Sequence, residues 1–231
     1  MLRAFPDPET VAQEAAKFIA AVGIGRVYGH GRFDLVLSGG RTPLPIYGRL
    51  AAEFGHQMRL WTHTHIWWGD ERCVAPNNHQ SNYYAARLSL IMPLAIADDR
   101  VHRIHGESED AAGAAADYQR LFPARPDVLV LGLGEDGHVA ALFPGSSLLR
   151  EEQRLFAAVS GSPKPPAGRI TLTPRVISSA RRVLVVAWGA AKAAAVRRVF
   201  SAEGSIEETP ARLARDALWM VDEAAASELG G

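Results

Sequence analysis

The sequence is short of several features, and each absence narrows what the chain can be. Its 231 residues include one cysteine, Cys73, so no disulfide can form within the chain and nothing indicates an oxidising compartment. Lys and Arg number 25, as do Asp and Glu, which leaves no excess positive charge to hold a nucleic acid. No apolar run approaches the roughly 20 residues of a membrane span, and residues 1–9 lack the apolar stretch of a signal peptide. These absences predict a cytoplasmic protein with neither a nucleic-acid nor a membrane partner.

The sequence does have the composition of a folded domain. Apolar residues make up 48% and charged residues 22%, close to the averages of globular proteins, which excludes a disordered chain. No internal repeat or low-complexity linker divides the chain, so we expect one domain over residues 1–231. That length can bury a sizeable core without covalent staples.

Short apolar runs alternate with Ala-rich amphipathic segments. The runs that we interpret as strands are 33–37, 65–68, 101–104, 128–131, 155–159, 169–171, 183–187 and 218–221. The segments that favour helices are 9–22, 43–54, 81–91, 110–121, 174–180, 190–202 and a short one after Asp222. This alternation predicts an α/β fold, a mostly parallel sheet with helices on both faces. Ligands bind such sheets beyond the carboxyl ends of the strands, so polar segments there are the candidate site.

The first such segment is Ser38-Gly-Gly-Arg-Thr-Pro43, which follows the strand 33–37. Glycines let backbone N–H groups approach a ligand closely. Pro43 suits the first helical turn and Thr42 the N-cap, so the positive helix end would face an anion. The hydroxyls of Ser38 and Thr42 would add donors. The alternative is an ordinary strand–helix turn, and the segment is no Walker loop because no Lys follows the glycines.

The second segment is the charged trio Asp70-Glu71-Arg72, directly after the strand 65–68. It is either a solvated turn or a polar cluster that grips hydroxyls or positions a base. Ser81 or Asn82 could cap the helix that follows.

The third segment spells Gly132-x-Gly-x-x-Gly137 after a strand, the pattern of a dinucleotide-binding turn. That pattern needs a helix and an acidic residue about 20 positions later. Here Pro144-Gly145 interrupts the chain and Glu151 comes too early, so we expect no nicotinamide cofactor. The informative residue is His138, directly after Asp136-Gly137, because imidazole can take a proton near neutral pH and a nearby carboxylate can fix its tautomer.

Two further segments each place one cation near the end of a predicted strand. Arg169 begins one strand, and Lys192 follows another in the first turn of a helix. The helix dipole disfavours a cation there, which indicates an anion to be neutralised. A solvent-facing lysine is the alternative.

A Pro-rich stretch and a pair of histidines are further candidates for a functional role. The Pro-rich stretch 160–168 is either a surface loop or a stiff loop at the mouth of a site. His63 and His65 alternate along a strand, but no third ligand is evident, so we expect no metal.

Taken in order, these segments resemble the 6-phosphogluconolactonases of the oxidative pentose phosphate pathway. The matching motifs are Leu37-Ser-Gly-Gly-x-Thr-Pro43, Trp68-Gly-Asp-Glu-Arg-Cys-Val74 with Ser81-Asn-Tyr83, Gly132-x-Gly-x-Asp-Gly-His138 with Leu142-Phe-Pro-Gly145, Ser162-Pro-Lys-Pro-Pro166, Arg169-Ile-Thr-Leu172 and Gly189-x-x-Lys-Ala193. Each motif is moderately specific, and their ordered combination is highly specific.

The resemblance implies a Rossmann-like core, shared with the glucosamine-6-phosphate deaminases, and hydrolysis of 6-phospho-D-glucono-1,5-lactone to 6-phospho-D-gluconate. It implies a phosphate site made of Ser38, Gly39, Gly40, Arg41, Thr42, Arg169 and Lys192. It assigns His138 as the general base that activates water, with Asp70 and Arg72 at the sugar; Asp70 either assists the base or only grips substrate. Backbone N–H groups of a Gly-rich turn would stabilise the oxyanion. Neither metal nor cofactor is implied, and we expect a monomer or weak homo-oligomer.

Two positions depart from the family pattern. Two other functions are alternatives to the lactonase. Position 41 is Arg where the family has Ser or another small residue, and position 141 is Ala where Ser is usual. Arg41 either adds phosphate affinity or points to solvent. A deaminase would carry a glutamate shortly after the histidine, and none occurs before Glu151. A non-catalytic sugar-phosphate sensor would need a DNA-binding module, for which the chain has neither room nor a basic segment.

Overall fold

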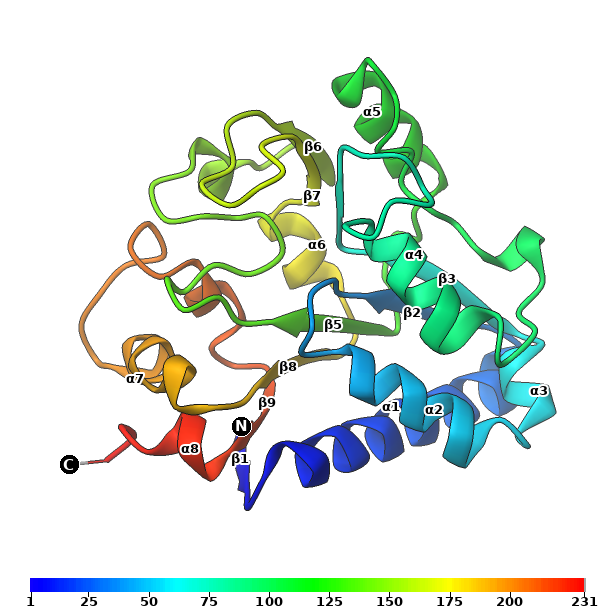
Figure 1. Ribbon diagram of the computed structural model, residues 1–231, viewed down its shortest axis with the longest axis horizontal. Coiled ribbons are helices and arrows are strands. Elements are labelled where there is room, and N and C mark those ends of the chain that lie inside the picture. Colours follow the sequence, from blue (N-terminus) through cyan, green and yellow to red (C-terminus); the bar gives the residue numbers. More distant parts are fainter. Residues whose placement is uncertain (231) are drawn as a thin grey trace.

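The computed structural model describes residues 1–230, in which nine strands form two sheets (Figure 1). The strands are β1 Leu2–Phe5, β2 Phe33–Leu37, β3 Thr64–Trp68, β4 Asp70–Arg72, β5 Val128–Gly132, β6 Phe156–Val159, β7 Arg169–Leu172, β8 Val183–Ala187 and β9 Leu218–Asp222. The large sheet has the order β1-β9-β8-β5-β2-β3 and every pairing in it is parallel. The prediction of a mostly parallel α/β fold is confirmed.

Helices connect the strands. They are α1 Pro8–His30, α2 Leu44–Phe54, α3 Met58–Trp61, α4 Asn82–Ala86, α5 Ala111–Leu121, α6 Pro174–Ser179, α7 Ala193–Phe200 and α8 Glu223–Ala226. A π-helical turn (Arg87–Ile91) continues α4, and 3₁₀ turns cover Asp98–Arg100, Ser147–Arg150, Ala190–Lys192 and Pro210–Ala214. In Figure 1, α1 and α2 lie on one side of the large sheet and α6 on the other. No helix within residues 1–230 combines the length and apolarity that crossing a bilayer requires.

The central strands form because their residues are wholly apolar. Every residue of β2 is buried, as are four of the five in β5 and in β8. Strands covered on both faces show this continuous pattern rather than an alternating one. Because the strands are parallel, the loops after β2, β5 and β8 leave the sheet at one edge, where the site lies.

The second sheet is antiparallel, with the order β4-β7-β6. The runs 155–159 and 169–171 were expected as members of the parallel sheet, and they form β6 and β7 here instead. The third strand of this sheet is β4, which consists of the charged trio. A solvated turn was one of the two interpretations of that trio, and the structure shows a strand instead. β4 pairs Asp70 with Thr171 and Arg72 with Arg169, so the small sheet brings residues from two distant segments together.

Other boundaries differ from the sequence predictions. The strand predicted over 101–104 is wrong: only Val101 pairs with Ile66, in an isolated bridge, and the His102 ring then stacks on Trp67 at 3.9 Å. β1 was missed because its four residues are at most half-buried.

α1 continues to His30, eight residues beyond its predicted end, despite three glycines in that stretch. Gly23 is required there, because a Cβ atom would lie 2.7 Å from Leu60 and 2.8 Å from Phe33. The helix ends where Gly31 takes a left-handed conformation, φ 70°.

Candidate active site

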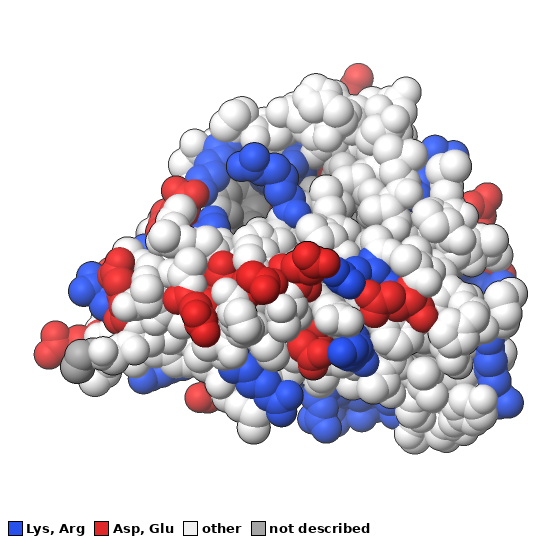
Figure 2. All heavy atoms as spheres, turned by 60° about the horizontal axis from the view of Figure 1, so that its bottom comes forward, with Lys and Arg blue, Asp and Glu red and all other residues white. Residues whose placement is uncertain are grey.

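A cavity of about 860 Å³ opens at the carboxyl edge of the large sheet. Figure 2 shows this hollow with Lys and Arg side chains gathered around its rim. Its lining includes all ten residues that the sequence predicted for the site: Ser38, Gly39, Gly40, Arg41, Thr42, Asp70, Arg72, His138, Arg169 and Lys192. The loops after β2, β5 and β8, the strands β4 and β7, and the Pro-rich loop all contribute.

His138 is paired with a carboxylate in the turn after β5. Its Nδ1 lies 2.5 Å from Oδ1 of Asp136. A carboxylate only accepts, so Nδ1 carries a proton, and in the neutral imidazole the lone pair is on Nε2. Burial favours the neutral acid of Asp136, but the hydrogen bond and charge of His138 outweigh it and hold the pKa of Asp136 well below its usual value. The carboxylate therefore stays ionised and fixes the tautomer of the imidazole.

The His138–Asp136 pair fits because residue 134 in the turn after β5 is a glycine. A Cβ atom on Gly134 would lie 2.0 Å from His138 Nδ1 and 2.5 Å from Asp136 Oδ1. Gly137 has φ 89° and packs against Thr209. The N–H groups of Gly134 and Gly137 donate to His138 O and Gly134 O. They are occupied within the turn, so the expectation that such a turn supplies oxyanion donors does not hold for these two. No α-helix follows the turn, as predicted when the dinucleotide pattern was set aside.

The loop after β2 offers free donors. Within residues 1–230, the N–H groups of Gly39, Gly40, Arg41 and Thr42 donate no hydrogen bond. The prediction that Thr42 caps the helix is wrong, because α2 begins at Leu44 and its N-cap is Pro43, without a side-chain cap. The loop nevertheless lines the cavity and has four consecutive free N–H groups, as anion-binding backbone does.

Tyr47 anchors this loop. Its buried hydroxyl accepts from Ser38 N at 2.9 Å and donates to Ser38 O at 2.8 Å. Burial raises the pKa of Tyr47 far above its ordinary value, so the hydroxyl remains a neutral donor.

Replacing Tyr47 with Phe is expected to lower the free energy of unfolding by about 1–3 kcal/mol, because two buried backbone groups lose their partner. Urea unfolding measures the change. Tyr28→Phe is the matched control, since Tyr28 is 67% exposed. Equal stability of the two variants would contradict the anchoring role.

Asp70 and Arg72 enter the cavity from β4. Asp70 is buried, and Asn82 Nδ2 donates to its backbone oxygen at 2.8 Å and lies 3.3 Å from its Oδ1. Arg72 donates from Nη1 to Gln80 O. Gly39 must be glycine because a Cβ atom there would overlap the Asn82 side chain at 2.0 Å.

Glu71, the middle member of the trio, points elsewhere. Its buried carboxylate accepts from the N–H groups of Asn82 and Tyr83 and from the hydroxyl of Ser81. Burial is the largest influence and raises its pKa. Ser81 is the N-cap of α4, as predicted. Glu71 therefore stabilises the start of α4 rather than lining the cavity.

The two predicted phosphate cations are placed differently. Arg169 is buried, donating from Nε to Pro166 O and from Nη2 to the carbonyls of Lys164 and Pro165, with Nη1 3.9 Å from Asp70. Lys192 is the N-cap residue of α7 and lies 3.7 Å from Glu135. Lys192 is thus the more available of the two, while most of the Arg169 guanidinium is engaged with backbone.

Sequence comparison identifies the family. A model of the glucosamine-6-phosphate isomerases/6-phosphogluconolactonase family matches residues 6–221. The chain belongs to this family. A 6-phosphogluconolactonase of Streptomyces coelicolor is 35% identical over 96% of this chain and 92% of its own length. One of Mycobacterium leprae is 34% identical over 98% and 97%.

Solved structures of the family share the architecture. A 6-phosphogluconolactonase of Trypanosoma brucei superposes with a TM-score of 0.90 at 27% identity, covering 100% of this chain and 98% of that one. A monomeric glucosamine-6-phosphate deaminase superposes with a TM-score of 0.85 at 21% identity, covering 98% of this chain and 99% of that one, and has a similar fold.

The two residues that depart from the family pattern, Arg41 and Ala141, differ in their exposure to solvent. Arg41 is exposed on the rim of the cavity. Ala141 is fully buried, and its N–H donates to the hydroxyl of Thr171 at 3.0 Å. Only Arg41 is placed to contact a ligand.

Sequence reasoning missed three contributors to the site. Asp136 was noted only as a neighbour of His138, although it is the carboxylate that holds the ring. Asn82 was considered only as a cap, and Lys164 only as part of a Pro-rich motif. Both line the cavity. The sequence signal for Lys164 was the Ser-Pro-Lys-Pro-Pro motif that contains it. Of the two interpretations of this Pro-rich stretch, the structure favours a loop at the mouth of the site.

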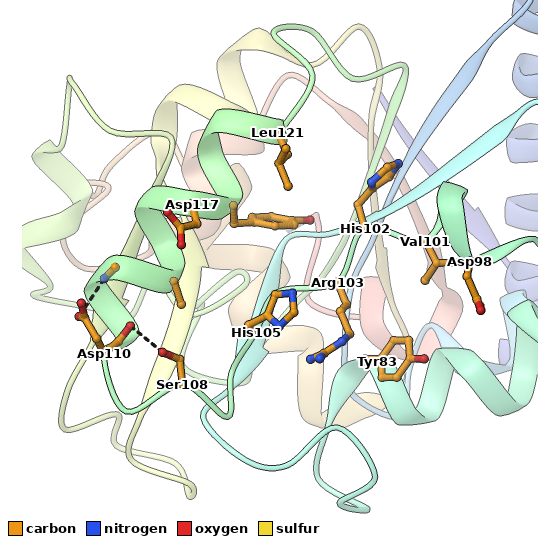
Figure 3. A pocket seen from close by; sticks show the side chains of 13 residues that line it. Tyr83, Asp98, Val101, His102, Arg103, His105, Ser108, Asp110, Asp117 and Leu121 are labelled. Atoms are coloured by element: carbon orange, nitrogen blue, oxygen red, sulfur yellow. Dashed lines mark hydrogen bonds between the residues drawn. The ribbon is translucent and has the colours of Figure 1, made fainter.

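A second hollow of about 650 Å³ lies between the loop 101–108 and α5 (Figure 3). Two of its charged groups are engaged with neighbours: Arg103 pairs with Glu107, and Asp110 accepts from the N–H of Gly113 at the start of α5. It contains none of the predicted site residues. His65, the histidine once considered as a ligand, contacts His102 at 2.9 Å, and no group of three metal-ligating side chains gathers within residues 1–230.

Proposed function

We propose that this chain hydrolyses 6-phospho-D-glucono-1,5-lactone to 6-phospho-D-gluconate, in the cytoplasm. The observation that carries the proposal is the His138–Asp136 pair in a cavity with a basic rim. A lactone is an activated ester, so its hydrolysis needs only a base, a water molecule and stabilisation of the oxyanion. A phosphorylated lactone also needs an anion site, which the rim supplies.

His138 acts as the general base. Its Nε2 removes a proton from water as the water oxygen bonds to C1, and Asp136 stabilises the imidazolium that forms. The imidazolium then returns the proton to the ring oxygen O5 as the C1–O5 bond breaks. The proton is thus conserved across the two steps, and the product is the open-chain acid.

The loop after β2 and Lys192 hold the substrate phosphate. Residues 39–42, whose N–H groups are free, and Lys192 line the same cavity, with Arg41 at its rim, which supports this assignment. Phosphate held there orients C1 toward His138, so remote binding energy lowers the barrier at the reacting carbon. Asp70 and Arg72 face the sugar and bind its hydroxyl groups.

The rival deaminase reaction is less well supported. That chemistry calls for a glutamate shortly after the histidine in the chain to assist ring opening, and Glu151 is the first acidic residue that follows His138. Its carboxylate accepts from the N–H groups of Gln153 and Arg154 and does not line the cavity.

Acid release from freshly generated 6-phosphogluconolactone tests the function directly. We expect the purified protein to exceed the spontaneous rate, with EDTA leaving the acceleration unchanged. Glucosamine 6-phosphate, offered under the same conditions, is expected to release no ammonia. Acid release at the spontaneous rate, or ammonia release, would overturn the proposal.

Lys192→Met is expected to weaken selectivity for the phosphorylated lactone. Each hydrogen bond to a charged group contributes about 1.5–3 kcal/mol, so kcat/KM should fall about 10–150-fold for 6-phosphogluconolactone. The value for unphosphorylated gluconolactone should hardly change. A variant that treats both lactones as the wild type does would place the phosphate elsewhere.

A further inference from the structure

The lactone end of the cavity needs a hydrogen-bond donor, and neither glycine N–H group of the turn after β5 is free to serve. As water adds to C1, negative charge develops on the carbonyl oxygen and must be stabilised. The N–H groups of Gly134 and Gly137 are already bonded inside the turn, and Arg169 directs most of its donors to backbone carbonyls. A free donor close to His138 is therefore the candidate for this contact.

Lys164 is the cation beside the proposed base. Its Nζ lies 3.7 Å from Asp136 Oδ1, the same oxygen that holds His138 at 2.5 Å. The Lys164 ammonium and the His138 imidazole therefore both contact the same carboxylate oxygen and are close neighbours. Within residues 1–230 Nζ donates no hydrogen bond, its side chain is 47% exposed, and it lines the cavity. Its three N–H donors remain available to a ligand.

The Pro-rich loop holds Lys164 in place. Pro163, Pro165 and Pro166 restrict the backbone on both sides of it. Ser162 Oγ donates to the carbonyl of Lys164 and accepts from its N–H. The buried Arg169 binds the carbonyls of residues 164–166. A buried guanidinium thus fixes the loop that carries an exposed ammonium.

We propose that Lys164 is a catalytic residue that donates a hydrogen bond to the C1 oxygen of the lactone, and that Arg169 is the positioning residue for its loop. The assignment rests on the proposed lactonase function. As the water oxygen bonds to C1, its proton passes to His138 and the C1=O π pair moves onto the oxygen that Lys164 contacts. When the carbonyl re-forms, C1–O5 breaks and His138 protonates O5. Lys164 remains protonated throughout.

Lys164→Met and Lys164→Arg test the proposal with two substrates. Loss of one oxyanion donor typically lowers kcat about 10²–10³-fold, and we expect that loss for Lys164→Met with KM changed less than threefold. The loss should be equal for 6-phosphogluconolactone and unphosphorylated gluconolactone. This differs from Lys192→Met, which should affect mainly the phosphorylated substrate. Lys164→Arg keeps the charge and should recover part of kcat.

Chemical rescue separates the ammonium from the shape of the loop. Alkylating Lys164→Cys with 2-bromoethylamine rebuilds an ammonium of similar reach and should restore at least a tenth of wild-type kcat. Wild type and Lys164→Met treated in the same way control for reaction at Cys73. An increase in KM alone, a loss confined to the phosphorylated lactone, or unchanged kcat would overturn the role of Lys164. A wild type that fails to accelerate lactone hydrolysis would instead overturn the proposed function.

Discussion

Replacing His138 with alanine is expected to lower kcat for 6-phosphogluconolactone by about 10²–10⁴-fold, the usual effect of losing a general base. The fold should survive, because the imidazole packs at the surface of the cavity against Phe143, with ring centroids 4.7 Å apart, rather than in the core. Stopped-flow acid release under saturating substrate measures kcat, and circular dichroism checks the fold.

His56→Ala is the control, since it removes an exposed histidine between α2 and α3 and should leave kcat unchanged. A His138→Ala enzyme within threefold of wild type, with chemistry rate-limiting, would remove His138 from the mechanism.

Adding one methyl group at Gly134 is expected to come close to the effect of removing His138. The new Cβ would lie 2.0 Å from Nδ1 and 2.5 Å from Asp136 Oδ1, so the ring and the carboxylate must move. Without its carboxylate partner the imidazole loses its fixed tautomer and orientation, and we expect kcat to fall at least 100-fold, within the range for general-base loss. Overpacking should also lower the free energy of unfolding by about 1–3 kcal/mol.

Gly48→Ala provides the matched comparison. Gly48 lies on the exposed side of α2, where a Cβ atom meets nothing within 4 Å, so the change should preserve activity and slightly raise stability. Gly134→Ala with wild-type kcat would show that the tight turn is not needed to hold the pair.

The sequence signal was strongest where structure follows from local pattern. β2, β5 and β8 are continuous apolar runs, and such runs have few other interpretations in an alternating chain. His138 was found because polar residues after these strands share one edge of the sheet. Both inferences need only neighbouring residues.

The features that were missed depend on distant partners. β4 consists of Asp70, Glu71 and Arg72, and no propensity favours a strand of three charged residues. It forms because β7 pairs with its backbone while the side chains serve the cavity and the start of α4. Likewise, the position of Lys164 depends on Arg169 contacting the loop carbonyls, a tertiary contact that a Pro-rich motif alone does not indicate.

The arrangement of the sheet also bears on how the protein is made. β1, the first of the nine strands in chain order, pairs with β9, the last, and Leu2 lies beside Trp219. At about 5–20 residues per second, β1 waits roughly 10–40 s for its partner to be synthesised. For the much shorter interval between its own synthesis and that of β9, β8 also has an open edge, because β9 inserts between β8 and β1. Completion of the sheet therefore waits until β9 has been synthesised, and the nascent chain must keep two strand edges from pairing with other chains until then.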